Sequence, residues 1–252
     1  MGTVSNYVQR KALDRVPTPV LDTVGKALIK GIDLAVEQRW DAALERAADA
    51  EGLTLDDQVA SVAKGFRREL TSVGAASGAV AAVPGLGTAS ALGVLGAEVV
   101  WFSFRATDVI MTIGALHGRT DATPDERRAW VLAVMAYGEN AADEFAALVN
   151  EIDPSALARS GAAGAVLAGL LQGDTATVEM LRRVNSTLVS RVATRFGGRR
   201  GAVAMGRLLP FGIGAAVGGG ANYFLSRSLI KQTRRFFDAY PFAPARGELG
   251  AG

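Results

Sequence analysis

Residues Leu70–Ala97 read LTSVGAASGAVAAVPGLGTASALGVLGA and contain no charged side chain over 28 positions. Alanine and glycine make up half of this stretch, and Pro84 interrupts it. Small residues let helices approach closely, but they gain little free energy on transfer into hydrocarbon. The stretch therefore predicts an apolar helical hairpin buried in a bundle, an interpretation we favour over a helix that spans a bilayer.

A second uncharged stretch, Leu208–Ser226, reads LLPFGIGAAVGGGANYFLS over 19 positions. It again combines a proline with glycines and predicts a second hairpin. Both stretches are long enough to cross a membrane, so insertion of the hairpins stays open. Gly214 and Gly218 have the small-xxx-small spacing that lets helices associate in lipid. A homo-oligomer is therefore an alternative to close packing within one domain.

Helix signals dominate the rest of the chain, and we find no sustained strand-like alternation. Thr54 precedes an acidic first turn, and Thr123-Pro124-Asp125-Glu126 forms a capping box with proline at the first helical position. We expect helices at about Val20–Glu37, Asp41–Ala50, Asp56–Leu70, Ser72–Val83, Thr88–Leu116, Asp125–Glu151, Ser155–Leu171, Ala176–Phe196, Gly201–Leu209 and Ile213–Phe237. The sequence thus predicts an all-α helical bundle with two glycine/alanine-rich apolar hairpins. Residues 1–19 form an N-terminal segment, 20–240 a single domain and 241–252 a disordered tail.

The composition narrows the classes of function. The 252 residues carry 27 basic and 25 acidic side chains, a balance that gives no argument for nucleic acid as a partner. The absence of cysteine excludes disulfides, cysteine-based zinc sites and a thiol nucleophile. The mean hydropathy of +0.21 lies between those of soluble and polytopic membrane proteins. The first residues hold no apolar signal segment, so we expect a cytoplasmic protein.

The two apolar blocks carry a resemblance to a known family. The segments SGAVAAVPGLGTASALGVLGAEVVW, VIMTIGALHGRT, RLLPFGIGAAVGGGANYFLSRSL and KQTRRFF together resemble the bacterial EcsC family over about Gly65–Tyr240. The resemblance implies a helical bacterial protein and brings no catalytic residue with it. The family takes its name from an operon that also encodes an ABC-type transporter, so a transporter partner is implied by the name alone.

Three charged residues interrupt the apolar run of the long helix. Glu98, Arg105 and Asp108 are separated by seven and three residues and share one helical face. A buried charge must be paired, and Arg105 can bridge both carboxylates. We favour a structural ion-pair network here, and a polar pocket for the headgroup of a ligand is the alternative.

Basic residues flank the second apolar block. Arg227, Lys231, Arg234 and Arg235 follow it, with aromatic residues nearby. Such an arrangement attracts anionic lipid surfaces, although it is equally typical of a solvated helix end. Four aromatic side chains are expected to pack or insert at the membrane interface: Trp101, Phe102, Tyr223 and Phe224.

Catalysis has few candidates in this sequence. His117 is the only histidine, and Gly118 after it predicts a helix C-terminus, where an imidazolium is favoured by the dipole. One histidine and no cysteine leave few general bases near neutral pH. We therefore expect no enzyme, no metal and no cofactor.

These observations favour a non-enzymatic helical protein that associates with the inner face of the bacterial membrane, peripherally or through inserted hairpins. Anionic lipids are the expected partner, with Arg227, Lys231, Arg234 and Arg235 at their phosphates. The alternative is a soluble helical protein that holds a lipid or another apolar ligand in an interhelical cavity beside Glu98, Arg105 and Asp108.

Overall fold

The computed structural model describes residues 18–81, 88–153, 175–197 and 215–239. Every regular element in these ranges is helical, which confirms the predicted all-α fold. The elements are α2 (Thr18–Gln38), α3 (Trp40–Asp49), α4 (Leu55–Ala81), α5 (Thr88–Leu116), α6 (Pro124–Tyr137), the 3-10 turn η1 (Gly138–Asn140), α7 (Ala141–Ile152), α10 (Thr175–Gly197) and α12 (Ala215–Ala239).

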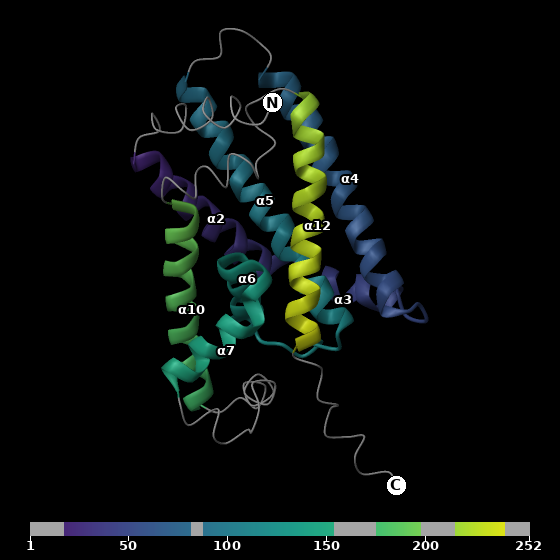
Figure 1. Ribbon diagram of the computed structural model, residues 1–252, viewed down its shortest axis with the longest axis vertical. Helices are drawn as coiled ribbons and strands as arrows, with labels where there is room; N and C mark the ends of the chain where they lie inside the picture. The colour runs from purple at the N-terminus through teal and green to yellow at the C-terminus, as the bar shows by residue number, and fades with distance from the viewer. Residues whose placement is uncertain (1–17, 82–87, 154–174, 198–214, 240–252) are drawn as a thin grey trace.

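Helix α5 is the central element of the bundle. It contacts α2, α3, α4, α6 and α12, and α2 is its closest neighbour (Figure 1). Gly31 explains this proximity, because a Cβ at this position would lie 2.0 Å from the Oγ of Ser103 on α5. The hydroxyl of Ser103 donates to the carbonyl of Val99 at 2.8 Å, so it is satisfied inside its own helix.

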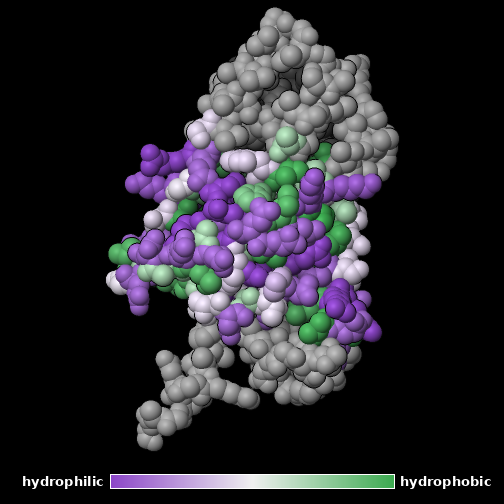
Figure 2. All heavy atoms as spheres, turned by 180° about the vertical axis from the view of Figure 1, so that it is seen from behind, coloured by the Kyte–Doolittle hydropathy of each residue, from purple (hydrophilic) through white to green (hydrophobic). Residues whose placement is uncertain are grey.

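The core is completed by aromatic side chains from α6, α7 and α12. The rings of Trp130 and Phe237 lie 5.2 Å apart, and those of Phe145 and Phe236 lie 5.8 Å apart, both in edge-to-face geometry. Phe236 and Phe237 are at most 1% exposed. The C-terminal part of α12 is therefore anchored in the core of the bundle. Hydrophilic side chains cover much of the described surface, with apolar side chains between them, on the face in Figure 2.

Two of the predicted helix boundaries are wrong. The expected helices Asp56–Leu70 and Ser72–Val83 are one continuous helix, α4. The expected helix Asp125–Glu151 is instead broken into α6, η1 and α7, because Gly138 adopts a φ of +64°, which is outside the right-handed helical region.

The two capping signals read from the sequence, at Thr54 and Thr123, are confirmed. Thr123 caps α6 through a complete capping box, with the Thr123 N–H donating to the Glu126 carboxylate at 2.6 Å. The Asp57 N–H donates to the Thr54 Oγ1 at 3.2 Å at the start of α4. The expected helices Ser155–Leu171 and Gly201–Leu209, the N-terminal residues 1–17 and the tail 241–252 lie outside the described residues.

Of the two predicted hairpins, the first is present as α4 and α5, which are consecutive and in contact. Of the second, only α12 is described.

Candidate functional site

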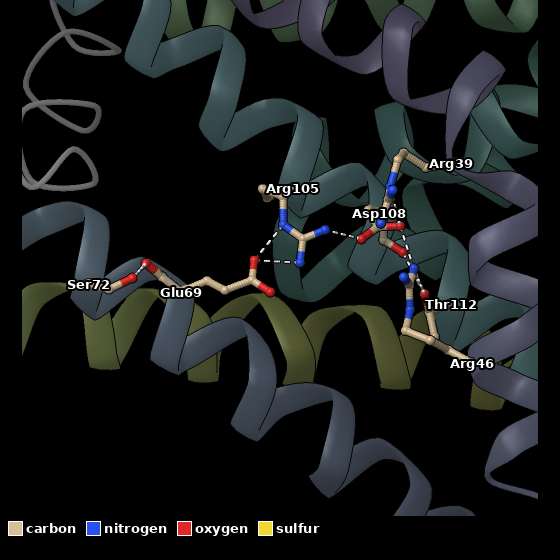
Figure 3. A network of polar contacts seen from close by, with 7 residues as sticks. All are labelled: Arg39, Arg46, Glu69, Ser72, Arg105, Asp108 and Thr112. Carbon is tan, nitrogen blue, oxygen red and sulfur yellow. Dashed lines mark hydrogen bonds and ion pairs between the residues drawn. The ribbon is translucent and has the colours of Figure 1, made fainter.

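A buried carboxylate on α5 organises the most extensive polar network of the described residues. Asp108 is 1% exposed and accepts hydrogen bonds from three arginines (Figure 3). The Nε of Arg39 lies 3.3 Å from its Oδ1, and Arg46 and Arg105 also form ion pairs with it. A carboxylate removed from water needs such partners, since its desolvation costs several kcal/mol.

Local structure explains why these three arginines converge. Arg105 and Asp108 are three residues apart on α5, so they share a face. Arg39 joins α2 to α3, where its N–H donates to Ala35 at 2.9 Å. Arg46 lies seven residues further on, two turns along, and therefore points to the same side of α3. The network thus ties the α2–α3 junction and α3 to α5.

A second carboxylate extends the network to α4. The Nε of Arg105 donates to the Oε2 of Glu69 at 2.6 Å. Arg46 also donates to the hydroxyl of Thr112 at 2.9 Å. Arg105 therefore bridges two described carboxylates, those of Asp108 and Glu69. The side chain of Glu98, predicted to have that role, lies outside the described residues.

The network borders a cleft between α3, α4 and α5 with a volume of about 300 Å³. Its walls include Arg46, Glu69, Arg105 and Asp108 together with apolar side chains such as Phe66. The hydrogen bonds of Asp108 and Arg105 go to each other and to neighbouring helices. This geometry supports the structural interpretation of Arg105 and Asp108, because it holds three helices together.

The basic residues of α12 lie beside acidic ones. Lys231 and Arg235 approach the two carboxylate oxygens of Glu139 at 3.2 and 3.6 Å. Arg234 forms ion pairs with Asp56 on α4 and, at 3.5 Å, with Asp238. Three of the four residues predicted to bind lipid phosphates therefore have carboxylate partners within the protein. Arg227 is exposed and has no ion pair with another described residue.

Of the predicted interface aromatics, Phe102 is 8% exposed and packs in the core. Trp101 is partly buried against the core. The side chains of Tyr223 and Phe224 lie outside the described residues.

His117 directly follows the last residue of α5, as the sequence predicts. Gly118 comes next and has a φ of +79°, outside the right-handed helical region. Its Nδ1 is 2.8 Å from the carbonyl oxygen of Ile113, and its Nε2 is 3.1 Å from Asp238 on α12. These contacts connect the ends of two helices. Within the described residues, no group of three or more histidine, aspartate or glutamate side chains could hold a metal ion.

Several charged groups are buried near the loop between α5 and α6. Burial raises the pKa of Glu126 above its usual value, and this is opposed by its hydrogen bonds with Thr123. Burial also lowers the pKa of Arg119, which the charges of Glu126 and Asp121 counteract. The hydrogen bonds of the capping box thus oppose the rise in the pKa of Glu126, and burial causes it.

Three helices bring uncharged segments to the same end of the bundle (Figure 1). The ion pair of Arg234 with Asp56 places the end of α12 beside the start of α4, so the two helices run in opposite directions. Ala215, 19 residues before Arg234, is then about 28 Å along the bundle. Arg105 and Glu69 meet near the middles of α5 and α4, and only six residues separate the end of α4 from the start of α5, so these two helix ends lie at the same end of the bundle (Figure 1).

We call this region the charge-free end, made of residues 71–81 of α4, 88–97 of α5 and 215–226 of α12. None of these residues is charged. In the sequence, this region is bordered by Glu69 on α4, Glu98 on α5 and Arg227 on α12. The sequence identified the uncharged stretches, but not that they lie together.

One described helix is long and apolar enough to cross a membrane by length and composition, the segment Val99–Leu116 with a mean hydropathy of 1.4. Because 72% of it is buried inside the bundle, it also fits the core helix of a soluble protein.

Comparison of the chain with protein-family models, with curated proteins and with solved structures found no match. The similarity to the EcsC family therefore stays a prediction.

Proposed function

We propose that this chain is a non-catalytic helical protein that associates with the inner face of the bacterial membrane through its charge-free end. The observation that carries the proposal is the meeting of three uncharged helix segments at one end of the bundle (Figure 1). Burying uncharged helix ends in a lipid interface avoids the large cost of moving charge into hydrocarbon. A protein of the EcsC kind, as the sequence suggests, is consistent with this role.

The distribution of charge gives further support. The end of α4 opposite the charge-free end carries Asp56 and Asp57, and the end of α12 carries Arg234, Arg235 and Asp238. Helices whose described residues carry charges at one end of the bundle and none at the other favour one orientation at a membrane surface. The charge-free end would enter the interface, and the Asp108 network would hold the helices together just beneath it.

The sequence analysis predicted two kinds of membrane contact, one through the apolar hairpins and one through the basic residues of α12. Three of these basic residues lie far from the charge-free end. Lys231, Arg234 and Arg235 lie on the last turns of α12, and Arg234 is about 28 Å from Ala215 along the helix axis. They are paired with Glu139, Asp56 and Asp238. A lipid role for these three residues would require the bundle to lie on its side. We therefore assign membrane contact to the charge-free end.

Fractionation of cells that express the protein tests the proposal. Membranes are washed first in high salt and then in alkaline carbonate. Retention through both washes is expected if the charge-free end enters the bilayer, and release by salt alone would limit the attachment to surface charge. Recovery only in the soluble fraction would refute membrane association.

A charged substitution in the charge-free end makes the test specific. Ala76→Glu introduces a carboxylate in the uncharged part of α4 and should shift the protein to the soluble fraction. Leu53→Glu is the matched control, because Leu53 is 54% exposed before the start of α4, at the other end. Equal retention of both variants would contradict the proposal. Circular dichroism verifies that each variant is folded.

A second function is favoured by a groove between α2 and α10 with a volume of about 690 Å³. Its walls combine the apolar side chains of Ile29, Leu34 and Val189 with charged ones such as Lys26 and Lys30, a mixture that suits an apolar ligand with a polar group. Such a ligand would make the chain a soluble binding protein. Native mass spectrometry of the purified protein would detect it as added mass, which Ala193→Trp in the groove should abolish.

A further inference from the structure

The charge-free end is bordered on one flank by exposed basic side chains that belong to two helices. Lys64 and Arg68 are on α4, and Arg227 is on α12. Arg68 is three residues before the uncharged segment of α4, and Arg227 directly follows that of α12. We call these three residues the basic band.

The ion pair between Arg234 and Asp56 sets the levels of these residues along the two helices. Arg227 is seven residues before Arg234, and Ala63 is seven residues after Asp56. Seven residues are about two helical turns in both helices, so Arg227 stands level with Ala63, on the flank where Arg234 meets Asp56. Lys64 is the next residue of α4, and Arg68 lies one turn nearer the charge-free end.

No carboxylate among the described residues forms an ion pair with the basic band. In α4, Glu69 is the only acidic residue between Asp57 and Ala81, and it is bound by Arg105 on the α5 side. In α12, no acidic residue precedes Asp238. Among the described residues, Lys64, Arg68 and Arg227 form no ion pair.

The basic residues nearer the end of α12 differ from the basic band both in their pairing with carboxylates and in their distance from the charge-free end. Lys231, Arg234 and Arg235 are paired with carboxylates, and they lie further from the charge-free end than Arg227 does. Positive charges attract anionic lipid within about a Debye length of the surface, so position decides which of them contribute.

We propose that Lys64, Arg68 and Arg227 bind the phosphates of anionic lipids when the charge-free end enters the membrane. The inference rests on the proposed membrane association and adds to it a class of lipid and the residues that select it. The uncharged helix ends supply apolar contact, and the basic band lies where the headgroups begin. Membranes rich in phosphatidylglycerol or cardiolipin are the expected partners.

Vesicle flotation tests this inference with the full chain. Binding is measured to neutral phosphatidylcholine vesicles and to phosphatidylcholine vesicles that contain phosphatidylglycerol, over a series of salt concentrations. The band variant is Lys64→Gln/Arg68→Gln/Arg227→Gln. The matched control, Lys231→Gln/Arg234→Gln/Arg235→Gln, removes the same number of charges from the other part of α12.

We expect the unmodified chain to prefer anionic vesicles and to lose that preference in high salt. The band variant should lower the partition coefficient for anionic vesicles roughly 100-fold, equivalent to about 1 kcal/mol per charge. Its binding to neutral vesicles should not change. The control variant should retain most of the preference for anionic vesicles.

Equal binding of the unmodified chain to both kinds of vesicle would refute the binding of anionic lipids by the basic band, while the proposed membrane association would still be supported. Binding to neither kind would overturn both proposals. A larger loss in the control than in the band variant would also refute the assignment. Because all three band residues are exposed, the single variants Arg68→Gln and Arg227→Gln provide a second test, with a loss of roughly 5-fold expected for each.

Discussion

Replacing Asp108 with asparagine should destabilise the bundle more than any other loss of a single charge described above. Asp108 is 1% exposed and accepts from Arg39, Arg46 and Arg105. Breaking a buried ion pair costs roughly 3–5 kcal/mol. The side chains of Arg39, Arg46 and Arg105 are 17–36% exposed, so water compensates them in part. We therefore expect a loss of about 3 kcal/mol in the free energy of unfolding.

Urea denaturation followed by circular dichroism measures this loss, and thermal melting should show a decrease in Tm of roughly 6–12 °C. Asp33→Asn is the matched control, because the side chain of Asp33 is 43% exposed and pairs with Arg128 at 2.7 Å. An exposed pair of this kind contributes about 0–1 kcal/mol. If Asp108→Asn costs no more than Asp33→Asn, the Asp108 network does not hold the helices together and the reasoning is refuted.

Three further substitutions test other parts of the fold. Gly31→Ala should lower the free energy of unfolding by about 1–3 kcal/mol in urea denaturation, because its Cβ would meet the Oγ of Ser103. Gly138→Ala should cost about 1–2 kcal/mol in the same assay, since its φ is +64°, and a neutral effect would refute the assigned break. Glu126→Gln keeps the capping box but removes a carboxyl whose pKa is raised by burial. A raised pKa means that the folded state binds the proton more tightly, so the contribution of Glu126 is present below its usual pKa of 4.5 and is lost as the pH rises through the raised value. Denaturation of both proteins between pH 4 and 7 should show the parent losing stability relative to Glu126→Gln as the pH rises, and a constant difference would contradict the shift.

The bounds of α5 were predictable because helix-breaking residues flank it on both sides. Pro84 and Gly85 precede its start, and Gly118 follows its end with a positive φ. The break at Gly138 was missed because the apolar pattern continues on either side of it. An isolated glycine in such a pattern is often tolerated in a helix, and its backbone angles are not visible in the sequence.

The opposite error occurred in α4. The sequence analysis placed a boundary between Leu70 and Ser72, yet the helix continues to Ala81. The hydroxyl of Ser72 donates to the carbonyl of Glu69 at 2.9 Å, so the serine is satisfied within the helix. The weak helix propensity of Ser72 is therefore outweighed by the continuous helix in which the residue lies.

The polar network was only partly predictable. The contact of Arg105 with Asp108 follows from their spacing on one helix. Arg39 and Arg46 are 69 and 62 residues away from Asp108. Their separation of seven residues could have indicated a shared face, but nothing in the sequence indicates which face of another helix it meets. The meeting of the charge-free segments depends on the same long-range packing.

The position of the charge-free end at a membrane is the central claim, and site-specific labelling tests it most directly. The chain contains no cysteine, so Ser90→Cys in α5 and Leu53→Cys before α4 each create one labelling site. Each is labelled with an environment-sensitive dye and mixed with vesicles that carry a lipid-bound quencher. The account predicts a blue shift and quenching at position 90 and neither at position 53. No spectral change at position 90, or equal quenching at both positions, would contradict it.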